Sequence, residues 1–115
     1  MMPMMSLKDF LAHPIRSTWI YEPPIEVYVR KAVHYIPFLG RPYECLDIAN
    51  IEVEEHKRHQ GVFKAWLKKA EQLCPVECVY IENVQNPILH DFLIREGYSK
   101  IDGFITSSYY KLIEG

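Results

Sequence analysis

The sequence predicts a mixed α/β (α+β) fold in which helices and strands alternate around one mixed sheet. Apolar residues recur at helical spacing in residues 60–73, an Asn-Pro pair opens a shorter helical segment at residues 86–96, and strand-like segments flank both. With 115 residues, of which 49% are hydrophobic, the chain has enough apolar material for one core. We therefore expect a single domain spanning residues 1–115.

The first 21 residues predict a short helix and a brief strand. Residues 4–13 carry apolar side chains at helical spacing, with Ser6 as a plausible N-cap and Pro14 after the end. Residues 16–21 predict a strand, which the following Glu-Pro-Pro sequence terminates.

Two longer strands follow. Residues 25–36 alternate apolar and polar side chains and are rich in Val and Tyr, which is typical of a strand, and a turn with Gly40 comes after them. Residues 45–53 do not alternate cleanly, which predicts a central strand covered on both faces.

The second half of the chain predicts two helices and three strands. In residues 60–73 the lysines lie opposite the apolar stripe, and we expect Phe63 and Trp66 to be core residues. The remaining predicted strands are residues 76–81, 98–101 and 104–113. The inward side chains of the helix at residues 86–96 are expected to be Ile88, Leu89, Phe92 and Leu93.

The overall charge and composition disfavour several functions. A net charge of −2 argues against binding nucleic acid by general electrostatics. No apolar run approaches the roughly 18 to 20 residues that span a bilayer, so we expect no membrane association and a cytoplasmic location. The three cysteines, Cys45, Cys74 and Cys78, match no common zinc motif and are expected to be buried free thiols, and we expect no metal site.

Residues 53–67 form the most informative segment, because they predict a strand end, a charged turn with one glycine, and an amphipathic helix. Peptide N–H groups at a helix start have no intrahelical acceptor, and the helix dipole adds partial positive charge there. A pyrophosphate can be held at such a place, and Gly61 would let the backbone approach it closely. The alternative interpretation is a polar turn that only caps the helix.

Two blocks of sequence together resemble the GNAT superfamily of acyl-CoA-dependent N-acetyltransferases. Arg58-x-x-Gly61-x-Phe63 is similar to the pyrophosphate loop of that family, and Asn86 through Gly97-Tyr98 is similar to its second cofactor-binding block. The resemblance covers residues 43–113. It implies a mixed, mostly antiparallel central sheet with helices on both faces, here shortened at the N-terminus.

The resemblance also implies that the cofactor is acetyl-CoA. The residues it assigns to the pyrophosphate loop are Arg58, His59, Gln60, Gly61, Val62 and Phe63. In the family, the strands of the two blocks splay apart and the pantetheine arm inserts between them. Transferred here, Ile51 and Val53 would offer main-chain groups to that arm, and Asn86 matches the asparagine of the second block.

The expected acid and base depart from the family pattern. Many members carry a tyrosine where this chain has Leu93, which leaves His90, one helical turn earlier, as a substitute proton donor, with Tyr98, Tyr109 and Tyr110 as unplaced alternatives. Where the family often has a glutamate this chain has Ala49. By strand alternation the nearest carboxylate on that face is Asp47, and Glu52 faces the other way. Without a dedicated base the amine could lose its proton through water.

The segment before residue 25 is shorter than in the family, where a strand and two helices help to wall the acceptor site. The acceptor groove would then be open to a macromolecular amine or completed by a second subunit. An exposed final strand at residues 104–113 would suit an edge-pairing homodimer.

The leading hypothesis is therefore an N-acetyltransferase that moves an acetyl group from acetyl-CoA to an amine of a protein or small molecule. The alternatives are a GNAT-like binding or regulatory module without catalysis, and a small α+β interaction protein in which the glycine turn is only a helix cap.

Overall fold

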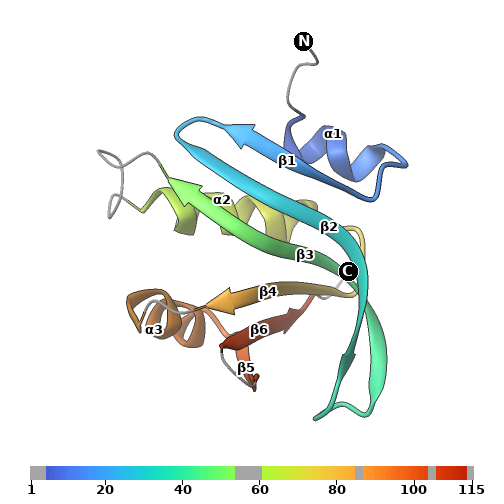
Figure 1. The fold of residues 1–115 in the computed structure, drawn as a ribbon, viewed down its shortest axis with the longest axis vertical. Helices are drawn as coiled ribbons and strands as arrows, with labels where there is room; N and C mark the ends of the chain where they lie inside the picture. The colour runs from blue at the N-terminus through green and yellow to red at the C-terminus, as the bar shows by residue number, and fades with distance from the viewer. Residues whose placement is uncertain (1–4, 54–60, 85–86, 104–105, 114–115) are drawn as a thin grey trace.

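The computed structural model describes residues 5–53, 61–84, 87–103 and 106–113, which form three helices and six strands (Figure 1). In chain order these are α1 (Leu7–Ala12), β1 (Ser17–Glu22), β2 (Ile25–Ile36), β3 (Arg41–Val53), α2 (Val62–Leu73), β4 (Cys78–Val84), α3 (Pro87–Arg95), β5 (Ser99–Asp102) and β6 (Ser107–Leu112). Each helix and strand predicted from the sequence has a counterpart, with boundaries that differ by a few residues.

The strands form one six-stranded sheet in the order β1-β2-β3-β4-β6-β5. Only β3 and β4 pair in parallel; the other neighbours are antiparallel. The predicted class, a mixed and mostly antiparallel sheet with helices, is confirmed. The final strand β6 lies between β4 and β5, so the prediction that it forms an exposed edge is wrong.

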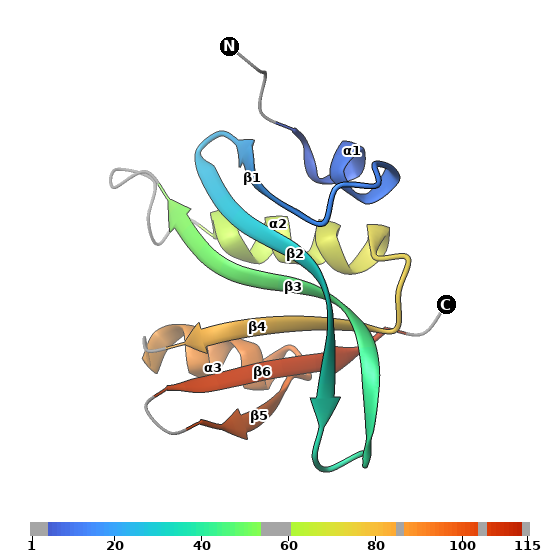
Figure 2. The same ribbon diagram turned by 45° about the vertical axis from the view of Figure 1, so that its right-hand side comes forward.

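All three described helices cover the same face of the sheet, which we call the helix face. Figure 2 shows α2 and α3 behind the strands, and the buried residues of all three described helices belong to one hydrophobic cluster. This cluster contains, among others, Leu7, Phe10, Val27, Val29, Ile48, Trp66, Leu67, Ala70, Ile81, Leu93 and Tyr109. The helices expected on both faces are therefore on one.

The opposite face of the sheet, which we call the open face, is also buried along part of β3. For this reason apolar and polar residues do not simply alternate in that strand. Cys45 and Asp47 of β3 point away from the helices and are nevertheless buried, at 3% and 0% exposed. Neighbouring strand side chains cover them, including Tyr80 and Tyr110, which form a second small cluster with Cys45. A strand can thus be buried on both faces without helices on both.

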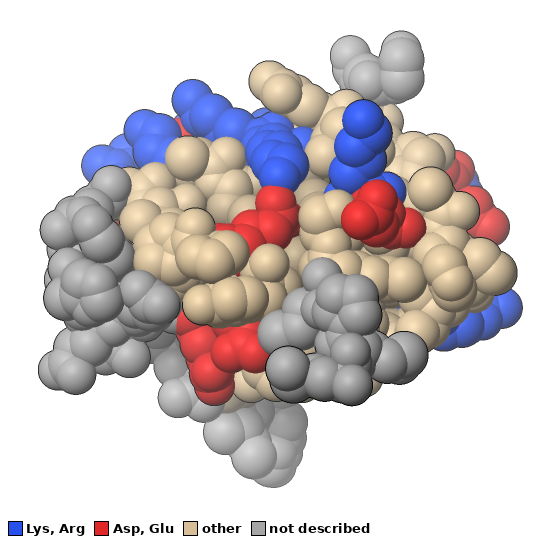
Figure 3. Space-filling view, turned by 90° about the horizontal axis from the view of Figure 1, so that it is seen from above, with Lys and Arg blue, Asp and Glu red and all other residues tan. Residues whose placement is uncertain are grey.

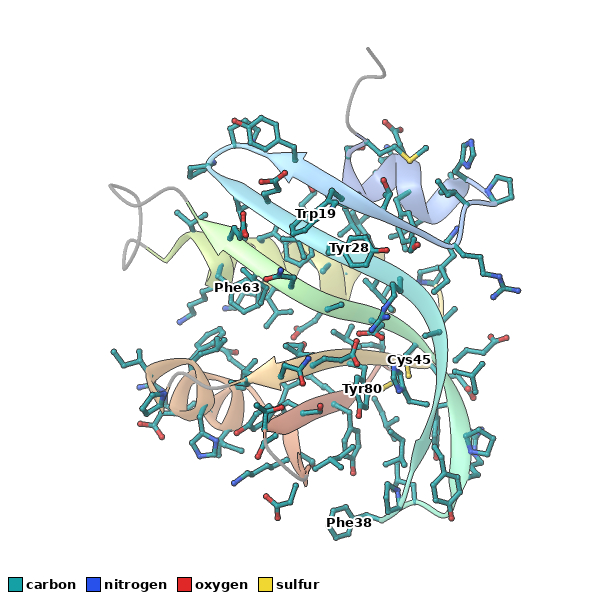
Figure 4. All side chains as sticks on the ribbon, in the orientation of Figure 1. Trp19, Tyr28, Phe38, Cys45, Phe63 and Tyr80 are labelled. Carbon is teal, nitrogen blue, oxygen red and sulfur yellow. The ribbon has the colours of Figure 1, made fainter. Side chains whose placement is uncertain are left out.

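The β2–β3 hairpin extends beyond the other strands as an arm (Figure 2). Phe38 lies at its tip, where Figure 4 labels it, and is 77% exposed. The arm forms because β2 and β3, with 12 and 13 residues, are longer than the neighbouring strand β4, which has 7.

The helices α2 and α3 differ in how well their inward faces were predicted. Trp66 on α2 is 5% exposed, as expected for a core residue, and Phe63 is half-buried. On α3 Leu93 is fully buried, but Ile88 is 64% exposed, so its predicted inward position is wrong. Among the described residues, no helix combines the length and apolar content needed to cross a membrane.

The carboxylate of Glu22, at the end of β1, joins three elements. It accepts hydrogen bonds from the backbone N–H of Leu7 in α1 and the indole N–H of Trp66 in α2, at 3.3 and 3.1 Å, and it pairs with Lys69. Burial acts to raise the pKa of Glu22, but these donors outweigh it and the pKa is lowered from its ordinary 4.5. The short helix α1, with Ser6 as its N-cap, is held to the sheet in this way.

Replacing Glu22 by alanine is expected to lower the free energy of unfolding by about 1–3 kcal/mol, because the Trp66 indole N–H loses its acceptor. Urea unfolding monitored by tryptophan fluorescence would measure the loss. Because the folded pKa is lowered, the Glu22 contribution is present above pH 4.5 and disappears as the pH falls through the folded value. Asp91→Ala, at an exposed position of α3, is the control and should change stability little; equal losses in both variants would contradict the assignment.

Candidate cofactor-binding site

The strands β3 and β4 separate part of the way along their length. Their parallel pairing runs from Cys45 opposite Cys78 to Ile48 opposite Ile81, although β3 continues to Val53. A slot of about 430 Å³ opens beyond the last pair. Its lining residues are Ala49, Asn50, Ile51, Ile81, Glu82, Asn83, Val84 and Leu89.

A β-bulge at the mouth of the slot changes which face the β3 residues occupy. Tyr28 of β2 pairs with Asn50, but the next residue, Val29, pairs with Ile48, which leaves Ala49 as the extra residue. Asp47 and Glu52 therefore share the open face. The prediction from simple alternation, in which Asp47 shares a face with Ile51 and Glu52 points the other way, is wrong because of this one inserted residue.

Gly61 is the N-cap of α2 and has a left-handed backbone, with φ 73° and ψ 15°. Among the described residues no side chain caps this helix end, and a Cβ atom built on Gly61 would meet no described atom within 4 Å. The predicted pyrophosphate position therefore lies at a helix start whose N–H groups receive no hydrogen bond from a described side chain. Val62 and Phe63 form the first turn of α2.

The remaining predicted cofactor residues lie around this end of the sheet or outside the described residues. Ile51 lines the slot, and Val53 ends β3. Arg58, His59, Gln60 and Asn86 fall outside the described residues.

The three predicted catalytic residues do not form one constellation. The buried carboxylate of Asp47 is bound by His34 and is 3.4 Å from the Arg30 guanidinium, so it is not available to a substrate amine. Glu52 is exposed, opposite Glu26 on the open face. His90 lies on α3, on the helix face, where its Nδ1 shares a hydrogen bond with the buried Tyr109 hydroxyl.

Sequence reasoning missed a charged cluster on the open face, formed by Arg30, His34, Asp47 and Glu82. Burial and the Asp47 carboxylate raise the pKa of Glu82, against the opposing effect of Arg30. The hydrogen bond that His34 donates to the Asp47 carboxylate raises the pKa of His34, although burial opposes it. One signal was available: Glu82 stands two residues after Tyr80 and so continues the same strand face, but the predicted strand stopped at Ile81.

Three other features bear on alternative sites. A second cavity of about 310 Å³ lies between the end of α1 and the hairpin arm, and none of the predicted site residues lines it. All three cysteines are free thiols; Cys45 and Cys78 are buried as predicted, whereas Cys74 is half-buried. On the face shown in Figure 3, basic side chains gather along one edge with acidic side chains beside them.

Comparison with known proteins places the fold. No family model and no curated protein matches the sequence. The fold is similar to the solved AtaT mutant toxin bound to the C-terminus of the antitoxin AtaR and acetyl-CoA, with a TM-score of 0.61, 8% identity, and coverage of 77% of this chain and 58% of AtaT. It is also similar to a chain of the KacTA–DNA complex, with a TM-score of 0.61, 6% identity, and coverage of 84% of this chain and 65% of the other.

The chain thus spans about 58 to 65% of the length of these solved chains. At such low identity the likeness concerns the fold alone, and a GNAT-like fold is supported by it.

Proposed function

We propose that this protein binds acetyl-CoA in the slot between β3 and β4 and transfers the acetyl group to an amine. The observation that carries the proposal is the separation of the two parallel strands after Ile48 and Ile81, together with a start of α2 that no described side chain caps. An extended pantetheine arm needs unpaired strand edges, and a pyrophosphate needs free peptide N–H groups. The two requirements are met by neighbouring parts of the same fold.

In this proposal the arm lies along Ile51 and Val53, and a peptide N–H near Val53 polarises the thioester carbonyl. The pyrophosphate is proposed to bind at the start of α2, where the resemblance assigns residues 58–63 to its loop. Lys64, exposed in the first turn of α2, adds positive charge close to this position. Asn86 retains its predicted role at the entry to α3.

The chemistry requires attack of an amine nitrogen on the thioester carbon, loss of one proton from nitrogen, and protonation of the departing thiolate. Leu93 cannot supply that proton, so we propose His90, with its partner Tyr109, as the donor. Asp47 is held by His34 and Arg30 and is no longer proposed as the base. The amine proton would pass to Glu52 or to water at the open face.

The acceptor is proposed to reach the slot from the open face, since no described helix covers it. This exposure favours an amine on a macromolecule, such as a protein, over a small amine enclosed by the fold. AtaT was solved with a protein antitoxin segment, which supports testing protein partners here. In a homodimer, β1 and β5 would be the strands available for edge pairing in the described sheet.

Calorimetric titration with acetyl-CoA, and then with desulfo-CoA, tests the proposal. Both ligands are expected to bind one site with a dissociation constant on the order of 1 μM, because the backbone cradle and the strand edges do not contact the sulfur. Thiol release in the presence of candidate amines would then measure transfer. If neither ligand binds, the protein shares only its fold with the solved toxin structures, and the proposed function is wrong.

Binding of both ligands without thiol release for any amine would favour a noncatalytic binding module. The observation behind this second candidate is Leu93, which stands fully buried where the family often carries its acid.

A further inference from the structure

The open face carries a compact group of metal-ligating side chains that the proposed function does not use for catalysis. The imidazole of His34, the carboxylate of Asp47 and the carboxylate of Glu82 each offer one ligand atom, and these atoms all lie within 4.8 Å of one another. They come from three adjacent strands, β2, β3 and β4. Figure 4 labels Tyr80, whose ring stacks on His34 of this group, beside β4.

The sheet holds these side chains in position. Asp47 pairs with Arg30 on β2 and with Tyr80 on β4, so its strand is fixed from both sides. The His34 imidazole stacks on the Tyr80 ring, with centroids 3.8 Å apart and planes 5° from parallel. Its Nε2 is thereby directed at Asp47, 2.9 Å away. A ligand set fixed in this way loses little conformational freedom when it binds an ion.

Asp47 also has an unsatisfied oxygen. Its side chain is 1% exposed, and within the described chain Oδ1 has no hydrogen-bond partner. An unpaired carboxylate oxygen in the interior is costly and in native proteins commonly marks a bound water or ion. Both carboxylates contact the same guanidinium, that of Arg30, so when His34 is neutral the group carries one negative charge that a further cation can neutralise.

We propose that His34, Asp47 and Glu82 form a binding site for a divalent transition-metal cation, with Zn²⁺ as the preferred ion. One imidazole nitrogen and two carboxylate oxygens suit Zn²⁺ and Mn²⁺ better than Ca²⁺, which takes oxygen ligands only. Zn²⁺ should bind more tightly than Mn²⁺ to such a set. Three protein ligands leave a coordination position for water.

Arg30 is the competing occupant of this site. Its guanidinium contacts both carboxylates, so an ion and the guanidinium cannot hold them at the same time. The Arg30 side chain is 42% exposed and can turn toward solvent. A bound metal ion therefore displaces the Arg30 guanidinium from the two carboxylates. Removing Arg30 removes this competitor and strengthens metal binding.

Titration of the full chain with ZnCl₂ and with MnCl₂ in metal-free buffer, without CoA, tests this inference. We expect Zn²⁺ to bind the His34 site with micromolar affinity and Mn²⁺ more weakly. His34→Gln and Glu82→Gln should each weaken Zn²⁺ binding at this site by about tenfold or more, following the cost of losing supporting or direct ligands. Arg30→Gln should bind Zn²⁺ several-fold more tightly than the unaltered chain.

His90→Gln is the matched control, because His90 is half-exposed on the helix face and also neighbours a carboxylate, that of Asp91. It should leave Zn²⁺ affinity unchanged. Far-ultraviolet circular dichroism shows whether each variant is folded. If one variant does not fold, the Co²⁺ absorption spectrum of the unaltered protein still reports the ligands. No Zn²⁺ binding, or equal binding after His34→Gln, would overturn the proposal, as would weaker binding after Arg30→Gln. None of these results depends on acetyl-CoA, so the proposed acyl transfer can fail separately.

Discussion

Acetyl-CoA binding is expected to be lost when Gly61 is replaced by glutamate. The new carboxylate would stand at the N-cap of α2, where the cofactor pyrophosphate is proposed to lie, and juxtaposed like charges in an interface cost several kcal/mol. Calorimetry should show affinity reduced by more than about 100-fold. A Cβ at Gly61 meets no atom of the described residues within 4 Å, so none of them would clash with it.

The backbone at Gly61 sets the control. Its φ of 73° is left-handed, so any side chain adds about 1–2 kcal/mol of strain, which urea unfolding would reveal in Gly61→Glu. Gly61→Asn introduces a neutral side chain that tolerates this conformation, and it should retain most of the affinity. Normal acetyl-CoA binding by Gly61→Glu would show that the pyrophosphate lies elsewhere.

Local signals were sufficient to predict most helices and strands. Ser6 caps α1 and Pro14 follows it, and the apolar spacing of residues 60–73 identified α2 with its buried Trp66. Such signals depend on neighbours a few residues apart, which the sequence displays directly. The glycine before α2 was recognised for the same reason.

The arrangement across the sheet could not be obtained in this way. One extra residue, Ala49, reverses the faces of the β3 side chains that follow it, and no local pattern marks the bulge. The position of β6 between β4 and β5 depends on pairing between distant segments. Placement of all three helices on one face is likewise decided by packing, since β3 has a buried open face without any helix.

The site was predictable to a similar degree. The glycine turn and Ile51 were predicted as cofactor-binding positions from motifs on one stretch of chain, and in the structure Gly61 begins α2 and Ile51 lines the slot. The charged cluster was not, because Arg30 and Glu82 are separated by 52 positions and meet only through the sheet. Its members looked like ordinary strand polar residues in the sequence.

Leu93→Ala is expected to destabilise the protein by about 3–5 kcal/mol, because Leu93 is fully buried and its truncation would leave a cavity beneath α3. Leu93 belongs to the core cluster that includes Trp66 of α2 and Ile81 of β4, beside the slot. Leu93 thus packs α3 onto the sheet. Urea unfolding would measure the change as a shift in midpoint.

Ile94→Ala provides the comparison at the next position of the same helix. Ile94 is 45% exposed and has the same number of carbon atoms as Leu93, so its truncation should cost well under about 1.5 kcal/mol. A large difference between the two variants would establish which face of α3 supports the slot wall. Equal losses would mean that α3 packs on the sheet in a different rotation. Leu89 would then not line the slot.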